Sequence, residues 1–400
     1  MNRKTMALLV LKVELFAFFV AAAAPSPLLV PFQHDFGFSA AMLTVIFATY
    51  AVALMVALLI AGGLSDHIGR RPVIIGTLLL ESAAMLVFLS AQSVEWLLAG
   101  RALQGVATGV AVGALNAAIL EAAPEDSRLG ALINGFAPLA GLAAGGVVTG
   151  LLIQKVSDPA TTTFIVLAAF FGLGAMASVR LPETSRMRPG TLRSLIPRMS
   201  LPHTARATFL SLVPGLIALW ATSGLYLSLI PVAMREVFDV KFALAGGLAI
   251  GLLNASGAVA PLLLRRYPAS LNTVLGSTAL LLGAGLAAAS VLLASAPTFL
   301  VATVMSGAGF GLAFSASPRQ VMEFVPADQR ASTFASIYVV SYVAFSVPAV
   351  LAGVLVHPFG LDDVLLGYAA AVMVAAGLGV VTSLRERARE QTTDVEVLAA

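Results

Sequence analysis

Long apolar runs, separated by short polar clusters, constrain this chain more than any other feature of its sequence. Twelve such runs cover residues 6–31, 41–63, 72–91, 96–122, 130–153, 162–180, 207–233, 243–264, 271–294, 298–323, 332–356 and 363–383. A helix needs about 20 apolar residues to cross the hydrocarbon core of a bilayer. The runs are about twice too long for the strands of a membrane β-barrel, and they do not alternate as such strands do. The sequence therefore predicts an all-α polytopic membrane protein with twelve transmembrane helices.

The composition supports the same conclusion. Hydrophobic residues make up 59% of the 400 residues and charged residues only 11%, whereas an ordinary soluble domain carries about 25% charged residues. The chain contains no cysteine, which excludes disulfides, cysteine-ligated metal sites and thiolate nucleophiles. The formal net charge of +3 is too small to indicate a nucleic-acid partner.

The distribution of Lys and Arg predicts the orientation in the membrane. With the N-terminus in the cytoplasm, seventeen of these residues fall in cytoplasmic loops and only Lys155, Arg235 and Lys241 fall outside. Cytoplasmic loops carry such an excess, so we expect a multi-pass protein of the cytoplasmic (inner) membrane with both termini in the cytoplasm. The first run resembles a signal peptide, but Lys12 and Glu14 interrupt it and its removal would reverse the orientation. We therefore expect it to remain in the protein.

A central polar interruption, which begins with Leu181-Pro182-Glu183-Thr184, divides the chain into two halves. We predict an N-terminal six-helix bundle (1–180), a cytoplasmic linker (181–206), a C-terminal six-helix bundle (207–385) and a cytoplasmic tail (386–400). A shift of 202 residues aligns 97–128 with 299–330 without gaps, with nine identities that end in a shared Glu-x-x-Pro-x-Asp-x-Arg pattern. Two parallel, pseudo-symmetric six-helix halves are a transporter architecture.

The sharpest local motif lies between the second and third predicted helices and reads Gly62-Gly-Leu-Ser-Asp66-His-Ile-Gly69-Arg70-Arg71. Glycine at position 69 permits a tight turn with positive φ. The stretch resembles motif A of the major facilitator superfamily, and matches it at Gly62, Asp66, Gly69, Arg70 and Arg71, while His67 stands where the family usually has a cation. The resemblance covers essentially the whole chain. It implies the major facilitator fold, in which two bundles rock about a central cavity lined by helices 1, 4, 7 and 10.

The same resemblance implies a charged latch that forms in one conformation and opens in another. In the family the motif A acid pairs near the start of helix 11, and the arginines meet acids near the end of helix 4. The nearby acids of this chain are Glu121 and Asp126. The alternative interpretation is an ordinary positively charged loop that ends one helix and begins the next.

Charged residues inside the apolar runs are candidates for proton coupling. Arg101-Ala-Leu-Gln104-Gly105 on the fourth helix resembles motif B of the drug:proton antiporter branch. A charge in lipid should face the protein interior and have a partner, unless the arginine reaches to the interface. Glu14 on helix 1 is the first candidate acid, with Arg101 as its possible partner, because the resemblance places helix 1 at the cavity. Glu81 in helix 3 is the rival, and a position of Glu14 close to the cytoplasmic interface is the alternative.

Glycines at a four-residue spacing, including Gly141 and Gly145 on the fifth helix, indicate close helix packing. They also match part of motif C of the antiporter branch, although Leu142 replaces its proline and Ala137 its first glycine. The antiporter assignment therefore rests on an incomplete motif.

Aromatic and amide side chains on the helices that the resemblance places at the cavity are candidates for substrate contact. Flat, amphipathic substrates suit such a lining, and ordinary packing or lipid contact is the alternative. The candidates are Gln104, Asn116, Trp220, Tyr226, Phe310 and Phe314.

These features together favour a secondary active transporter that works by alternating access, with proton-coupled efflux of small amphipathic compounds as the first hypothesis. A proton-coupled importer of a sugar or organic acid is the alternative, and a polytopic membrane enzyme is a remote one. No P-loop motif is present, so ATP is not expected to drive transport. The four histidines lie in loops or at helix ends without metal-ligand spacing, and we expect no catalytic residues, metal or cofactor: His34, His67, His203 and His357. The expected partners are a small-molecule substrate, protons and the bilayer, and we expect a monomer.

Overall fold

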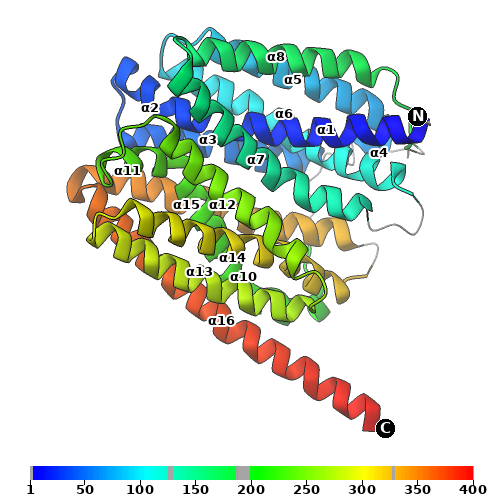
Figure 1. Ribbon diagram of the computed structural model, residues 1–400. Helices are drawn as coiled ribbons and strands as arrows, with labels where there is room; N and C mark the ends of the chain where they lie inside the picture. Colours follow the sequence, from blue (N-terminus) through cyan, green and yellow to red (C-terminus); the bar gives the residue numbers. More distant parts are fainter. Residues whose placement is uncertain (1–2, 125–128, 186, 188–198, 327–328, 400) are drawn as a thin grey trace. The chain divides into compact units, whose positions relative to one another are not determined.

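The computed structural model describes residues 3–399, apart from 125–128, 186, 188–198 and 327–328. Within these residues every regular element is a helix (Figure 1). The first half contains α1 (Arg3–Ala23), α2 (Pro25–Phe36), α3 (Ala40–Ala61), α4 (Ser65–Ile68), α5 (Arg70–Leu89), α6 (Val94–Ala122), α7 (Leu129–Lys155) and α8 (Pro159–Ser178). The second half contains α10 (His203–Ser228), α11 (Ile230–Glu236), α12 (Leu244–Leu263), α13 (Ala269–Leu292), α14 (Ala296–Glu323), α15 (Arg330–Phe359) and α16 (Leu361–Ala399).

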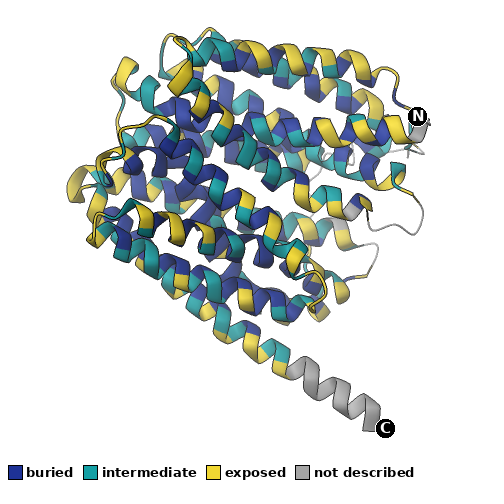
Figure 2. Cartoon of the chain, viewed as in Figure 1, coloured by how far each residue is buried: buried dark blue, intermediate teal, exposed yellow. Residues whose placement is uncertain are grey.

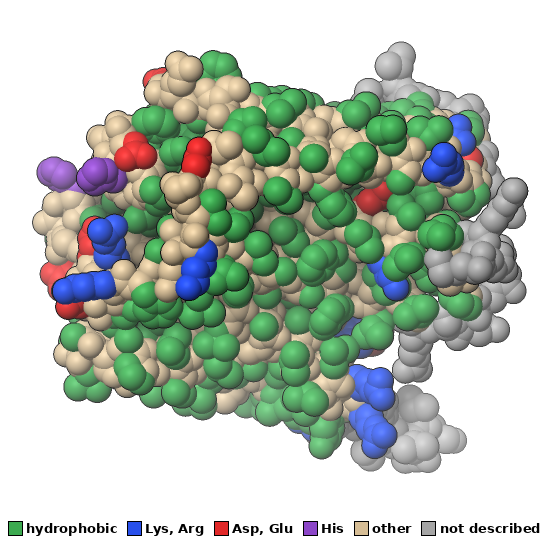
Figure 3. Space-filling view, turned by 45° about the horizontal axis from the view of Figure 1, so that its top comes forward, with side chains coloured by type: hydrophobic (Ala, Val, Ile, Leu, Met, Phe, Trp, Pro, Cys, Tyr) green, Lys and Arg blue, Asp and Glu red, His purple; other side chains and the backbone are tan. Residues whose placement is uncertain are grey.

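Twelve stretches of the described residues are helical, long and apolar enough to cross a membrane, which confirms the twelve-helix prediction. Hydrophobic side chains are spread over the whole face seen in Figure 3, and the charged ones gather mainly toward its left and right sides. Large apolar side chains such as Leu173 and Met176 are 65% and 70% exposed. Such exposure is favourable in lipid and costly in water, so the chain is a multi-pass membrane protein.

The first and seventh spans contain a break that the apolar pattern did not indicate. Helix α1 ends at Ala23 and α2 begins at Pro25, because Pro25 has no N–H to donate to the carbonyl of Ala21. In the same way α10 ends at Ser228, shortly before Pro231 in α11. The two proline breaks therefore fall in the first spanning segment of each half.

Polar side chains at several helix starts explain where those helices begin. Ser39 accepts a hydrogen bond from the amide of Met42 at 3.2 Å, and Asp158 accepts one from Thr161 at 3.0 Å. These side chains satisfy amide groups that the first helical turn leaves unpaired. Helices α3 and α8 therefore start immediately after a capping residue.

The chain divides into two compact units, each described here by itself. Unit 1 consists of Met1–Arg198 and Lys241–Gly251, and unit 2 of Met199–Val240 and Leu252–Ala400. Figure 2 shows that most helices carry buried residues along one side and exposed residues along another. In unit 1, stacked rings of Phe88 on α5 and Phe164 on α8, 5.0 Å apart, join two of these buried sides.

The 202-residue repeat corresponds to a shared mode of helix packing. Helices α6 and α14 begin 202 residues apart, at Val94 and Ala296. A side chain at any of four repeat-related glycines would collide with the backbone of the neighbouring helix. These are Gly105 and Gly109 against α3, at Tyr50 and Leu54, and Gly307 and Gly311 against α12, at Leu253 and Gly257. The repeated glycines are therefore places where two helices touch through their backbones.

Candidate functional site

Three polar side chains form a fully buried network inside unit 1. Arg101 and Gln104 lie three residues apart on α6 and so share a face, while Glu81 lies on α5. Arg101 is 1% exposed and the other two are 0% exposed. Arg101 Nη1 donates to Gln104 Oε1 at 2.9 Å, and Gln104 Nε2 donates to Glu81 Oε1 at 3.2 Å. Gln104 thus bridges the cation and the acid.

The same network holds the break in the first span. Gln104 Nε2 donates to the carbonyl of Ala21 at 2.9 Å, and Arg101 Nη1 donates to the carbonyl of Ala22 at 3.0 Å. In an unbroken helix the carbonyl of Ala21 would accept from residue 25, which here is a proline. The side chain of Gln104 replaces the missing donor. Changes at Glu81 can therefore reach the helix break through Gln104.

Several atoms of this network have no hydrogen-bond partner among the described residues. They are Nε and Nη2 of Arg101 and Oε2 of Glu81, all buried. The guanidinium carbon of Arg101 lies 5.6 Å from the ring centre of Tyr50, which offers a cation–π contact. Buried polar atoms are usually paired, so the network has positions open to a proton or a water molecule.

Glu14 lies in a separate buried place. It is 2% exposed and accepts a hydrogen bond from Ser178 Oγ on α8. The expected pairing of Glu14 with Arg101 is therefore wrong: Arg101 donates instead to Gln104 and to the carbonyl of Ala22 on α1. The reason is distance along α1: Glu14 meets α8, whereas Arg101 meets the carbonyl of Ala22, about two turns further along the helix.

The motif A residues form an ion-pair cluster at one end of unit 1. Arg70 Nη1 contacts Asp66 Oδ1, four residues earlier, and Arg70 Nη2 lies 3.0 Å from Glu121 Oε1 at the end of α6. Ser65 accepts a further hydrogen bond from Arg70 at 2.6 Å. Gly69 has φ +106°, a backbone conformation that favours glycine, and it separates α4 from α5.

Two further residues of this cluster were not foreseen from the sequence. Glu183 accepts hydrogen bonds from the backbone amides of Arg70 at 2.8 Å and Arg71 at 3.0 Å, and so caps α5. Thr184 donates to Glu121 at 2.5 Å. One signal was present: Gly69, directly before α5, offers no capping side chain, so the first amides of α5 needed a partner from elsewhere.

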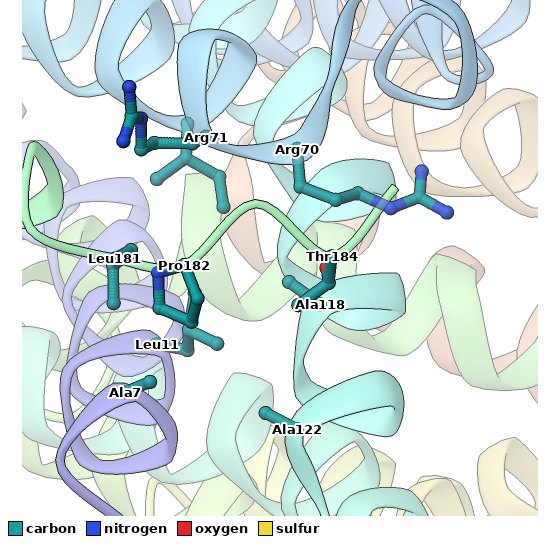
Figure 4. A pocket seen from close by; sticks show the side chains of 10 residues that line it. Ala7, Leu11, Arg70, Arg71, Ala118, Ala122, Leu181, Pro182 and Thr184 are labelled. Carbon is teal, nitrogen blue, oxygen red and sulfur yellow. The ribbon is translucent and has the colours of Figure 1, made fainter. Parts of the chain in front are cut away.

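Figure 4 shows how this segment is placed. Leu181 and Pro182 lie between the start of α5 and the residues Ala7 and Leu11 of α1, around a small pocket of about 280 Å³. The side chains of Arg70 and Arg71 point away from each other in this view.

The remaining latch candidates lie in different places. Gly62 follows α3, and its carbonyl faces Gly113 of α6 so closely that a side chain at Gly113 would collide with it. Asp126 lies outside the described residues. The predicted latch residues that are described thus gather around Arg70, except Gly62, which contacts α6, and Arg71, whose side chain points elsewhere.

In unit 2, Trp220 of α10 is the centre of an aromatic cluster. Its ring centre lies 5.7 or 5.8 Å from those of four other rings: Phe310, Phe314, Tyr342 and Phe345. Phe310 and Phe345 are buried, whereas Trp220, Phe314 and Tyr342 are partly exposed. Tyr342 and Phe345 of α15 were not among the predicted residues, although Phe334, Tyr338 and Tyr342 recur every fourth residue and so share one side of α15.

The other predicted cavity residues do not join this cluster. Tyr226 is buried and shares a hydrogen bond of 2.8 Å with Thr303, in a mostly apolar pocket of about 490 Å³ that also contains Phe299 and Tyr368. Asn116 lies on α6 of unit 1, where its backbone carbonyl accepts from Asn134 at 3.1 Å. Among the described residues no group of three or more His, Asp or Glu side chains is placed to hold a metal ion.

Comparison with known proteins identifies relatives of the chain. The sequence profile described as Major Facilitator Superfamily matches residues 15–349. The chain is 33% identical over 148 residues to the uncharacterized MFS-type transporter YhjO of Bacillus subtilis (strain 168), and 33% identical over 175 residues to the inner membrane transport protein YnfM of Escherichia coli (strain K12). These alignments cover 36% and 42% of this chain and only 35% and 40% of the relatives.

A further match, 28% identical over 148 residues, is the probable anion transporter 2, chloroplastic, of Oryza sativa subsp. japonica, covering 36% of this chain and 26% of that protein. Among solved structures, a bacterial homologue of the human lysosomal transporter Spinster, inward-facing and unoccupied, superposes with a TM-score of 0.77. It is 14% identical, with 96% of this chain and 97% of the other covered. A mutant of the nucleoside transporter NupG gives 0.74 at 13% identity, with 95% and 100% covered.

The structural matches establish the fold, because they span nearly the whole chain. The sequence match covers most of the chain and includes the motif A cluster, the buried Glu81 and the whole Trp220 cluster. The chain belongs to the Major Facilitator Superfamily.

Proposed function

We propose that this chain is a secondary active transporter that works by alternating access and exports small amphipathic compounds in exchange for protons. The observation that carries the proposal is the buried network of Glu81, Gln104 and Arg101. Ionisable groups inside membrane spans are costly, and they commonly mark ion and proton pathways. Membership of a superfamily that includes transporters supports transport over catalysis.

Within this proposal Glu81 is the proton-carrying group. Its Oε1 accepts from Gln104, and its Oε2 has no described partner, so a proton can reside on Oε2 without breaking the existing hydrogen bond. A neutral Glu81 attracts Gln104 and Arg101 less strongly than a carboxylate does. Those two side chains hold the carbonyls of Ala21 and Ala22. Because Gln104 Nε2 donates both to Glu81 and to the carbonyl of Ala21, proton binding to Glu81 would strengthen the hold on the break in the first span.

Glu14 is the second candidate for this role. It is buried, and its Oε2 also lacks a described partner, but its one hydrogen bond goes to Ser178. Ser178 leads neither to Arg101 nor to the helix break. The difference between the two acids can be measured as substrate-induced proton release from detergent-solubilised protein. Release that persists in Glu81→Gln but is lost in Glu14→Gln would transfer the role to Glu14.

The cluster of Asp66, Arg70 and Glu121 is the proposed conformational latch. Arg70 is only 11% exposed at its side chain and holds two acids from different helices. Glu183 and Thr184 extend the latch to the start of the predicted linker. A partly buried network of this kind is stronger than an isolated surface pair, so its opening can control a conformational change.

The Trp220 cluster is the proposed substrate contact of unit 2. Partly exposed rings bind flat apolar surfaces, and they stack or meet edge to face with aromatic ligands. This property supports amphipathic compounds as the substrate class.

One observation favours a second candidate, the movement of organic anions. It is the sequence similarity to the rice protein whose name is probable anion transporter. Import of an organic acid would use the same alternating-access cycle in the opposite direction.

Transport can be tested with everted membrane vesicles that carry a pH gradient. A panel of aromatic compounds, each in an anionic, a neutral and a cationic form, is compared with vesicles lacking the protein. We expect gradient-dependent accumulation of at least one compound. Accumulation that is unaffected by collapse of the gradient would remove proton coupling, and no accumulation of any compound would contradict the export proposal.

We propose that the protein acts in the cytoplasmic membrane as a monomer. Both of its termini would lie in the cytoplasm. The charge distribution described above supports this orientation. Reporter fusions after Ala400 and within residues 186–200 should both report a cytoplasmic location. A periplasmic signal from either fusion would overturn the proposed topology.

A further inference from the structure

A groove between α1 and α7 in unit 1 plays no part in the proton and latch chemistry proposed above. It is lined by Lys12, Val13, Phe16, Ile133, Phe136 and Ala137, around about 540 Å³ of space that is partly open to the surroundings. Five of these six side chains are apolar. The groove therefore combines an apolar wall with one positive charge.

Lys12 differs from the three buried charged side chains of unit 1. Glu14, Glu81 and Arg101 are buried and hydrogen-bonded. Lys12 is exposed, and within the described part of the chain its ammonium has neither a hydrogen bond nor an ion pair. A charge inside a membrane span normally has a partner. The groove thus offers a cation that is free to bind an anion.

The groove is short because the two helices touch at one end of it. A side chain at Gly141 would collide with the carbonyl of Phe16, and one at Gly145 with the carbonyl of Val20. The residues of α1 that line the groove run from Lys12 to Phe16, a length of about 6 Å at 1.5 Å per residue. A phospholipid tail extends through about 15 Å, half of the hydrocarbon core, and does not fit this length.

An aromatic ring system does fit a groove of this length. Phe16 and Phe136 line the groove and offer aromatic contacts to such a ring. A carboxylate or sulfonate on the ring would form a charge-assisted hydrogen bond with the ammonium of Lys12. We propose that the α1–α7 groove binds an aromatic organic anion, with its acidic group on Lys12 and its ring between Phe16 and Phe136. That this anion is the transported substrate rests on the proposed function, whereas the binding itself does not.

Two probes with the same ring and different charge test the proposal. They are 2-naphthoate and its neutral analogue 2-naphthamide, titrated calorimetrically into the purified full chain in non-ionic detergent. We expect wild type to bind 2-naphthoate about tenfold more tightly than 2-naphthamide, the effect of one charge-assisted hydrogen bond. Lys12→Gln should remove this preference, and Lys12→Arg should keep most of it.

Matched controls separate the groove from general charge and packing effects. Lys155→Gln removes another exposed lysine, at the far end of α7, and should leave both affinities unchanged. Phe136→Ala should weaken both probes by about the same factor, because it acts on the ring and not on the charge. Equal binding of the two probes by wild type, or an unchanged 2-naphthoate affinity in Lys12→Gln, would overturn the proposal. The second outcome would mean that Lys12 only extends to the membrane surface.

A lipid headgroup is the competing source of negative charge. The titration is therefore repeated in nanodiscs of phosphatidylcholine with and without phosphatidylglycerol, and we expect 2-naphthoate affinities within twofold of each other. Strong competition by phosphatidylglycerol that disappears in Lys12→Gln would assign the groove to lipid and overturn the proposal. Vesicles that show no transport, together with Lys12-dependent binding of 2-naphthoate, would contradict the proposed function alone and leave the anion site supported.

Discussion

The two units resemble each other in how their helices pack and differ in what they bury. In both, glycines at repeat-related positions of α6 and α14 let two helices meet through their backbones. Unit 1 buries three charged side chains, Glu14, Glu81 and Arg101, whereas unit 2 buries none among its described residues. Unit 2 has the aromatic cluster of Trp220 instead. The repeat therefore preserves a scaffold, and each half carries different chemistry on it.

The turns of the two units differ in the same way. The turn between α3 and α5 in unit 1 holds the ion-pair cluster of Arg70. The turn between α12 and α13 in unit 2 contains the exposed residues Arg265, Arg266 and Tyr267, and no acid stands between these two helices. Among the described residues, fully buried charge is thus found in unit 1. The predictions below test whether that division is functional.

The largest effect is expected at Glu81. Glu81→Gln keeps the shape and the contact with Gln104 but cannot bind and release a proton, so pH-gradient-driven transport should fall to roughly 1% of wild type or less, as expected when a proton relay is removed. The measurement is initial uptake into everted vesicles at equal protein content. Glu14→Gln is the matched control and should keep at least about half of the activity, because Glu14 is not connected to Arg101. Inverted results for the two variants would show that Ser178 and Glu14 form the coupling site.

The second prediction concerns the feature that the units share. Gly105→Ala in unit 1 and Gly307→Ala in unit 2 each place a Cβ against the backbone of a neighbouring helix. Overpacking of this kind costs about 1–3 kcal/mol, so both variants should yield several-fold less monodisperse protein after size-exclusion chromatography in detergent.

Gly76→Ala and Gly367→Ala are the controls for this pair, because a Cβ at either position meets nothing within 4 Å. Both controls should behave as wild type. A loss in only one unit would show that the repeat no longer reflects equivalent packing.

The helices of both units could be predicted from sequence because long apolar runs have no other stable form in a bilayer. The contacts within the site could not. Glu183 lies 113 residues from Arg70 along the chain, and no local pattern places its carboxylate at the start of α5. The link from Arg101 through Gln104 to Glu81, and not to Glu14, depends on how three helices are rotated about their axes and shifted along them. Apolar patterns leave that rotation open when most sides of a helix are hydrophobic.

The third prediction concerns the latch of unit 1. Asp66→Asn removes one of the two acids that hold Arg70 and should shift the balance between conformations without altering the substrate site. We expect the transport rate to fall about fivefold, while substrate affinity changes by less than about twofold, which corresponds to a conformational bias of about 1 kcal/mol. Glu183→Gln should act in the same direction, because it weakens the cap of α5.

The measurement for the latch variants is the maximal rate and the half-saturation concentration of the best substrate from the vesicle panel. Arg265→Gln in the corresponding turn of unit 2 is the control and should change neither. An Asp66→Asn protein that transports at the wild-type rate, or that only binds more weakly, would show that the cluster is an ordinary helix connection.

The smallest effect is expected in unit 2, at Trp220. An aromatic contact with a ligand is worth about 0.5–1.5 kcal/mol beyond its buried area, so Trp220→Ala should raise the half-saturation concentration of an aromatic substrate about threefold and leave the dependence on the pH gradient unchanged. Trp220→Phe retains a ring and should keep most of the affinity.

Phe345→Leu provides the packing control for Trp220→Ala. Phe345 touches Trp220 but is only 5% exposed, so loss of its ring should lower thermal stability without changing affinity. If Trp220→Ala altered the pH dependence as Glu81→Gln does, the separation of proton chemistry in unit 1 from substrate contact in unit 2 would be wrong. Equal affinity of Trp220→Ala and wild type would instead show that the aromatic cluster is only a packed core, and that the substrate contacts lie elsewhere.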